Sequence, residues 1–154
     1  MSAHLDKLAF RFFKLFAQYE YALKAMNFAR TGSGGQAEPD WDKFSNNVGH
    51  LVLNEPSQEV AEAIGYLFEY PPKKQILNDG ALAWQEMPNN EKSSQILFSH
   101  IRRVRNNLYH GGKFNGQWFD PDRSEQLISK SLVVLKDLQE KHAELAEAIN
   151  GNHA

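Results

Sequence analysis

The 154-residue sequence contains no cysteine and has almost no excess charge of either sign. The lack of cysteine excludes structural disulfides, thiolate zinc sites and cysteine nucleophiles. The formal net charge is -2 at pH 7, whereas a protein that coats nucleic acid along its whole surface is strongly basic. Any contact with nucleic acid must therefore come from a local basic patch. The sequence offers two such patches, one with Arg102, Arg103, Arg105 and Lys113 and one with Lys73 and Lys74.

Long apolar runs are also lacking, since no window approaches the roughly 18 uninterrupted apolar residues of a membrane span. The N-terminal segment carries Asp6 and has no apolar run followed by a small-residue cleavage site, so it does not read as a signal peptide. We therefore expect a cytoplasmic protein with no membrane contact. Hydrophobic residues make up 42% and charged residues 23%, which argues against disorder and predicts one globular domain over residues 1–154.

Apolar residues recur at steps of three or four along most of the chain, which is the periodicity of amphipathic helices. The expected helices cover about 3–30, 41–53, 57–68, 90–110 and 122–149. Asp40 and Ser57 are candidate N-caps for the second and third of these. We find no internal repeat and no alternating strand pattern. The sequence therefore predicts an all-α fold, a bundle of four long helices with short additional helices.

Three segments with helix-breaking residues interrupt this pattern. Residues 73–88 are the least regular part of the chain, and Asn78-Asp79-Gly80 within them is a turn signal. Gly111-Gly112 ends the helix over 90–110, because glycine takes the left-handed conformation without steric cost. The Gly-rich stretch 31–35 is expected to end the first helix and to begin a flexible loop.

Residues 102–113 (RRVRNNLYHGGK) offer chemistry that no other part of the chain matches. They place three arginines and a histidine at the end of an expected helix. The guanidinium of Arg105 has a rigid fork of donors that suits a phosphoryl oxygen. His110 lies at a helix C-terminus, where the macrodipole favours the charged imidazole, and a histidine that titrates near neutrality suits general acid-base work.

This combination resembles the HEPN superfamily, the helical domains named for higher eukaryotes and prokaryotes nucleotide-binding. The family motif is Arg, then a polar residue that is often Asn, then a short spacer that ends in His near the end of a late helix. Arg105, Asn106 and His110 match it residue by residue. Arg103 fits the looser family spacing as a second-choice arginine. Many members also carry an acid on the first long helix that supports the arginine, and Glu20 is the natural candidate, although Asp6 and other acids are available.

The resemblance implies metal-independent RNA cleavage, in which a 2′-hydroxyl attacks the adjacent phosphate. His110 would move a proton, Arg105 would stabilise charge on the phosphorane-like transition state, and Asn106 would position His110 or the substrate. RNA rather than DNA follows from the need for the 2′-hydroxyl. No cofactor is implied. The residues expected to bind substrate are Arg102, Arg103, Tyr109 and Lys113.

A metal site is not expected. His50 and His100 are the histidines that could be imagined as ligands, but neither has a second histidine or a paired carboxylate at i+4.

Helix geometry suggests that a complete site needs two copies of the chain. Asn106 and His110 are four residues apart and share a helix face, whereas Arg105 is turned about 140° from His110. A symmetric interface could present both pairs in one cleft. The resemblance implies the same, because HEPN nucleases are typically dimers with a composite site. We therefore expect a toxin-like or defence-associated homodimer that acts on RNA, with any antitoxin or regulatory partner being a separate protein.

Two other functions stay open at this point. The second interpretation is a noncatalytic HEPN module that binds nucleotide or RNA, or that serves as a dimerising adaptor, although a purely structural relative needs neither Arg105 nor His110. The third interpretation is an unrelated helical bundle that acts through protein contacts. It predicts that Arg105 and His110 are exposed and far from any interface or cleft, with Arg102 and Arg103 as solvated surface residues.

Overall fold

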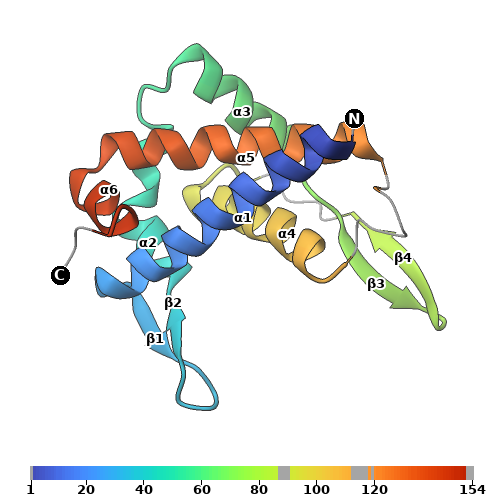
Figure 1. Ribbon diagram of the computed structural model, residues 1–154, viewed down its shortest axis with the longest axis horizontal. Coiled ribbons are helices and arrows are strands. Elements are labelled where there is room, and N and C mark those ends of the chain that lie inside the picture. The colour runs from blue at the N-terminus through green and yellow to red at the C-terminus, as the bar shows by residue number, and fades with distance from the viewer. Residues whose placement is uncertain (1, 87–90, 112–117, 119, 152–154) are drawn as a thin grey trace.

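The computed structural model describes residues 2–86, 91–111, 118 and 120–151 (Figure 1). Within these ranges the α-helices are α1 (Ser2–Ala25), α2 (Trp41–Asn47), α3 (Gln58–Glu69), α4 (Ser94–Tyr109), α5 (Pro121–Lys141) and α6 (Ala143–Ile149), with a 3-10 helix η1 (Gly49–Leu53). The strands are β1 (Ala29–Thr31), β2 (Ala37–Pro39), β3 (Lys74–Asn78) and β4 (Ala81–Gln85). They form two antiparallel hairpins, β1-β2 and β3-β4, which project from the helical body.

The prediction of an all-α bundle is wrong, because the helices share the chain with these two small sheets. The expected helix over 3–30 ends at Ala25, and the chain turns where Asn27 adopts a left-handed φ of 69°. The Gly-rich stretch after it closes a hairpin in which Ala29 pairs with Pro39 and Thr31 with Ala37. Strands of three residues are too short to show an alternating pattern in the sequence.

The second hairpin lies within the stretch that the sequence marks as least regular. The turn predicted at Asn78-Asp79-Gly80 is confirmed, since Asp79 and Gly80 adopt φ values of 51° and 80° between the paired residues Asn78 and Ala81. Positive φ at both central residues is the requirement of the commonest tight hairpin turn. The strands themselves were missed because their side chains are mostly exposed on both faces, which leaves no hydrophobic alternation to detect.

The predicted helix starts are confirmed at two positions. The Asp40 side chain accepts a hydrogen bond from the Lys43 N–H, and Ser57 accepts one from the Val60 N–H. The last expected helix, over 122–149, is instead two helices that meet at His142. Its ring accepts a hydrogen bond from the Leu145 N–H, so His142 caps α6 rather than continuing α5.

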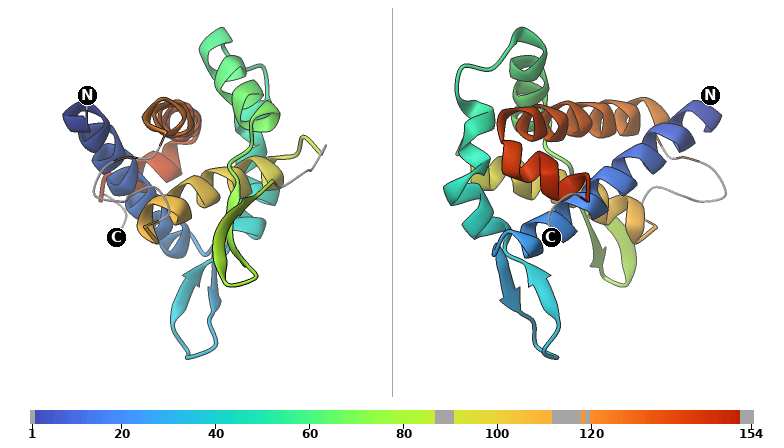
Figure 2. Two further views of the ribbon diagram at one scale, coloured as in Figure 1. Left: turned by 90° about the vertical axis from the view of Figure 1, so that its right-hand side faces the viewer. Right: turned by 60° about the vertical axis from the view of Figure 1, so that its left-hand side comes forward.

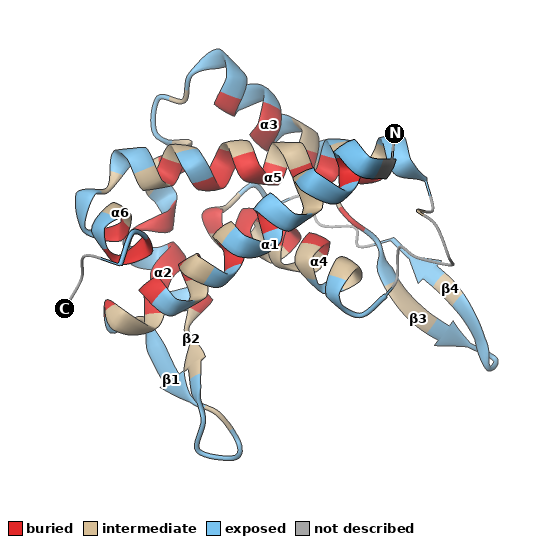
Figure 3. Cartoon of the chain, viewed as in Figure 1, coloured by how far each residue is buried: buried red, intermediate tan, exposed pale blue. Residues whose placement is uncertain are grey.

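The core lies where α1 crosses α5 and α4, and α3 packs on another side of α5 (Figures 1 and 2). Buried residues line the inward faces of these helices (Figure 3). Trp41 of α2 stacks against Phe16 of α1 and Phe98 of α4, which joins three helices through one aromatic cluster. Tyr19 is fully buried and its hydroxyl donates a hydrogen bond to the Leu135 carbonyl. In the described part of the chain, none of the helices is both long and apolar enough to span a bilayer.

Candidate functional site

The helix α4 holds most of the candidate residues and is anchored at both ends. Ser93 caps its start by accepting a hydrogen bond from the Ile96 N–H. At its other end the His110 N–H donates to the Asn106 carbonyl, 2.9 Å away, and Gly111 follows with a φ of 78°. The predicted glycine stop is therefore confirmed at Gly111. Gly112 lies outside the described residues.

A hollow of about 560 Å³ runs along the polar face of α4 and is closed on one side by β3. The residues that line it are Lys74, Gln75, Ser99, Arg102, Arg103, Asn106, Asn107 and His110. The α4 residues recur at steps of three and four, so they share one helix face. Three side chains of this lining are basic, and none of the lining residues is a carboxylate. We name this hollow the α4 cavity; its chemistry favours an anion.

The wall formed by β3 was not predicted as part of the site. Asn107 fastens it, because its side-chain amide donates a hydrogen bond of 2.9 Å to the Lys73 carbonyl. Lys74 and Gln75 then face the cavity from β3. The sequence does show Lys73-Lys74 as a second basic patch, but only the fold brings Lys74 beside the arginines of the first one.

Arg105 occupies a different surface from the other candidates. Its guanidinium carbon lies 4.5 Å from the centre of the Tyr109 ring and 5.6 Å from that of Phe16 on α1. Its Nη1 donates a hydrogen bond of 3.2 Å to Asn106 Oδ1, and Arg105 is not among the residues that line the α4 cavity. Within one chain the structure therefore brings Arg103, Asn106 and His110 to the same cavity, whereas Arg105 contacts Asn106 from outside the cavity.

The other predicted substrate-binding residues differ in whether they line the α4 cavity. Arg102 and Arg103 are half-buried in the cavity wall, while Tyr109 is exposed, with its ring 5.2 Å from the His110 ring in an edge-on arrangement. Tyr109 therefore reaches the neighbourhood of His110 without lining the cavity. Lys113 lies outside the described residues.

Glu20 lies beside Arg102 rather than Arg105. Its Oε2 accepts a hydrogen bond of 3.1 Å from Trp41 Nε1, and the Arg102 guanidinium carbon lies 5.9 Å from the centre of the Trp41 ring. Burial lowers the pKa of Arg102, whereas the charges of Asp42 and Glu20 raise it. The alternative acid Asp6 accepts a hydrogen bond from Trp118 Nε1 instead.

His100 contributes a neutral ring next to the cavity. It is 5% exposed, its Nε2 has no hydrogen-bond partner among the described residues, and its ring packs edge-on against Phe68. Burial lowers the pKa of His100 to about 4, with a further contribution from the positive charge of Arg103. In the part of the chain that the structure describes, no three His, Asp or Glu side chains are grouped so that they could hold a metal ion.

Comparisons of the chain with protein-family models, with curated proteins and with solved structures found no match. The residues of the α4 cavity and the motif at Arg105, Asn106 and His110 are the features that point to a function.

Proposed function

We propose that this chain is a HEPN-like, metal-independent endoribonuclease that works as a homodimer. One observation carries the proposal: the α4 cavity gathers Arg102, Arg103 and Lys74 around the single histidine that ends α4. A phosphodiester fits both the cationic side chains and the histidine. Cations bind its oxygens, and an imidazole moves a proton to or from the reacting hydroxyl.

In the proposed reaction the 2′-oxygen of a ribose attacks the adjacent phosphorus. A base removes the 2′-hydroxyl proton while the O2′–P bond forms, and the bond from phosphorus to the 5′-oxygen of the next nucleotide breaks. That oxygen takes up a proton, so the products are a 2′,3′-cyclic phosphate and a 5′-hydroxyl. His110 moves a proton in this scheme, Asn106 orients the ring or the substrate, and Arg103 binds the phosphoryl oxygens.

The separation of Arg105 from His110 supports a composite site in a dimer. Arg105 lies on the Tyr109 side of α4 and does not line the cavity that holds His110, so a second copy of the chain would supply the arginine that completes the site. A toxin-like or defence-associated role, a cytoplasmic location and a separate neutralising protein belong to the same proposal.

One observation favours a second candidate, a noncatalytic module that binds RNA or nucleotide through the α4 cavity. The cavity lining has several phosphate-binding groups but only one histidine, and in a single copy Arg105 does not join it. Such a module would bind an anionic ligand without cleaving it.

The decisive experiment is cleavage of total cellular RNA in EDTA by the wild-type protein and by His110→Ala. The proposal requires fragments that end in cyclic phosphate with wild type and none with the variant. His50→Ala is the matched control, because His50 is exposed on η1 and does not line the cavity. Equal cleavage by wild type and His110→Ala would overturn the assignment of His110. Binding without cleavage by a dimeric wild type would favour the second candidate.

A further inference from the structure

The helix α1 carries a second row of aromatic side chains on the side that faces away from the core. Phe10 is 64% exposed, Phe13 is 47% exposed and Tyr21 is 59% exposed. With Ala17 they recur at steps of three and four, so they form one stripe along the helix. A continuous exposed apolar stripe of this size marks a surface that another molecule covers. The core-facing aromatic residues, Phe12, Phe16 and Tyr19, lie on a different side of the same helix.

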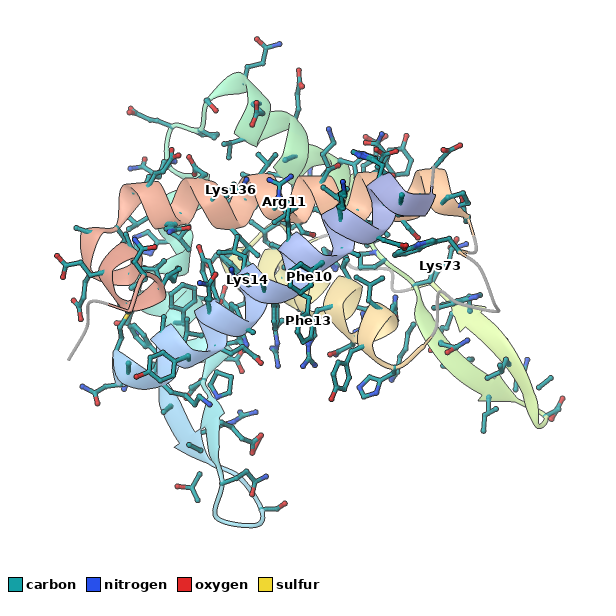
Figure 4. All side chains as sticks on the ribbon, in the orientation of Figure 1. Phe10, Arg11, Phe13, Lys14, Lys73 and Lys136 are labelled. Carbon is teal, nitrogen blue, oxygen red and sulfur yellow. The ribbon has the colours of Figure 1, made fainter. Side chains whose placement is uncertain are left out.

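Positive charges accompany this stripe. Lys7 and Lys14 are exposed on the same helix, and Figure 4 shows Lys14 beside Phe10. Arg11 lies on the α5 side of α1 instead, where it lines a hollow with Lys136. Asp6 is the exposed acid of α1, and its carboxylate already accepts the hydrogen bond from Trp118. The stripe therefore combines flat apolar rings with cations, which is the combination that fits a flexible polyanion with flat bases.

The stripe continues towards the candidate site. Phe13 precedes Phe16 by three residues, so the two are neighbours on the helix. The Arg105 guanidinium lies over Phe16, and Tyr109 lies 4.5 Å away on that guanidinium. The sequence spacing on α1 thus leads from the Phe16 that Arg105 covers to the exposed Phe13 and Phe10. We call these groups the planar row: Tyr109, Arg105, Phe13 and Phe10.

An apolar hollow next to the row offers space for a ring. It measures about 380 Å³ and lies between α1 and the end of α6. Phe10, Phe13 and Tyr21 line it from α1, and Ala148 and Ile149 line it from α6. Lys14 stands at the same hollow, so a base inserted there would have its phosphate within reach of a cation.

We propose that the planar row binds the single-stranded part of an RNA substrate next to the scissile phosphate, with bases stacked on Phe13 and Phe10 and phosphates paired with Lys7 and Lys14. This inference rests on the proposed function for the identity of the nucleic acid. A duplex does not fit the row, because its bases are stacked on each other and present no free face.

A second copy of the chain is the competing occupant, and the charges argue against it. A two-fold axis at Phe13 would set α1 against α1 and Lys14 against its own copy, which is a like-charge contact. An RNA strand instead brings negative charge to Lys7 and Lys14.

The test uses the full-length wild-type chain and a single strand of about 12 nucleotides of 2′-O-methyl RNA, which cannot be cleaved because the attacking hydroxyl is blocked. Its affinity is measured by fluorescence anisotropy, beside that of the same strand annealed to its complement. The double variant Phe10→Ala/Phe13→Ala should bind the single strand about tenfold or more weakly. Lys14→Gln should reduce the slope of log affinity against log salt by about 0.7. The matched control is Leu77→Ala/Leu82→Ala, which removes side chains of 72% and 73% exposure from the β3-β4 hairpin and should leave the affinity unchanged.

Three results would overturn the inference. These are an unchanged affinity in the double variant, an equal or greater preference of the wild type for the duplex, and conversion of a dimer to a monomer by the double variant in light scattering. The last result would assign the stripe to a second copy of the chain. The cleavage assay separates this inference from the proposed function. If the protein binds the single strand through Phe10 and Phe13 but does not cleave RNA, the planar row is supported and the proposed nuclease activity is contradicted. If cleavage depends on His110 but the double variant binds the single strand as well as wild type does, the nuclease activity is supported and the planar row is contradicted.

Discussion

The guanidinium of Arg105 stacks on the Tyr109 ring, 4.5 Å from its centre, four residues further along the same helix. Phe16 of α1 closes the other side of this contact at 5.6 Å. The stack holds Arg105 on the α1 side of α4, while Arg103 and His110 face the α4 cavity. Arg105 and Arg103 therefore lie on two different surfaces of α4. In the proposed function Arg103 acts in the cavity of its own chain, and Arg105 acts in the cavity of a second copy.

Subunit mixing should show which arginine shares a site with His110 across a dimer. His110→Ala and Arg105→Ala should each lower cleavage by about 10²-fold to 10³-fold, because each removes a group that acts on the transition state. Mixed dimers of these two variants should regain about a quarter of wild-type activity, since half of the dimers are mixed and each mixed dimer has one complete site. The measurement is RNA cleavage after co-refolding of differently tagged chains.

The matched mixture is His110→Ala with Arg103→Ala. It should regain nothing beyond the activity of Arg103→Ala alone, because both residues line the same cavity of one chain. If this mixture recovers activity and the Arg105→Ala mixture does not, the two arginines have exchanged roles and the composite site is built from Arg103.

The stop of α4 should depend on backbone conformation at Gly111. Gly111 has a φ of 78°, and a Cβ added there would meet no atom within 4 Å. Gly111→Ala should therefore lower the free energy of unfolding by about 1 kcal/mol through backbone strain alone. Gly65 is the control, because it lies inside α3 with equally open space and no positive φ. Gly65→Ala should raise stability by about 0.5–1 kcal/mol in urea denaturation, and a loss at both positions would contradict this account.

The stability of the protein should fall as pH drops from 6.5 to 4 because of His100. The pKa of this buried ring is about 4 in the folded chain, against about 6.5 when unfolded. Above pH 6.5 the ring is neutral in both the folded and the unfolded chain, so protonation of His100 takes nothing from the free energy of unfolding. Below it the unfolded chain takes up a proton that the folded chain does not, so up to about 3 kcal/mol is lost on the way to pH 4.

Urea denaturation of wild type and His100→Leu at pH 7.5, 6 and 5 measures this contribution. The difference between the two proteins should shift in favour of the variant as pH falls. The leucine also removes the buried Nε2 that lacks a hydrogen-bond partner among the described residues, so it need not weaken the core at pH 7.5. Parallel pH profiles would show that His100 does not carry the effect.

The Tyr19 hydroxyl should contribute to stability through its contact with α5. It is buried and donates to the Leu135 carbonyl, and burial together with the charge of Asp137 raises the pKa of Tyr19 well above its usual value, so the donor stays protonated. Tyr19→Phe leaves that carbonyl without this donor and should lower stability by about 1 kcal/mol, or about 2–4 °C in melting temperature. Tyr21→Phe, two residues away and exposed, should change neither.

The helices could be predicted from the sequence because their signals are local. The caps at Asp40 and Ser57 and the stop at Gly111 each depend on a side chain or backbone angle within four residues. The two hairpins could not be predicted, because their strands are short and exposed and lack an apolar alternation. The break at His142 was hidden because the apolar spacing continues across it from α5 into α6.

In the candidate site, too, the features set by local sequence could be predicted and those set by long-range packing could not. The 140° between Arg105 and His110 follows from helix geometry, and the structure places them on separate sides of α4. The partners on those sides come from distant parts of the chain: Lys74 from β3 for the cavity and Phe16 from α1 for Arg105. Glu20 was predicted from its position on the first helix, but its contact with Trp41 directs it to Arg102. Long-range packing decides such contacts, and a single sequence does not encode it in a readable pattern.

The packing of α1 has a consequence for how the protein is made. Its buried face rests on α5 and α6 as well as on the aromatic residues of α2, so its cover is complete only after α6, which follows it by more than 100 residues, has left the ribosome. Until then Phe12, Phe16 and Tyr19 are covered only in part, and a nascent chain in this state is exposed to aggregation. A chain that stops after Lys141 would lack α6 and keep part of α1 uncovered. The order of the chain therefore makes α6 the last cover of α1, and we expect chaperones to bind the nascent chain until α6 has emerged.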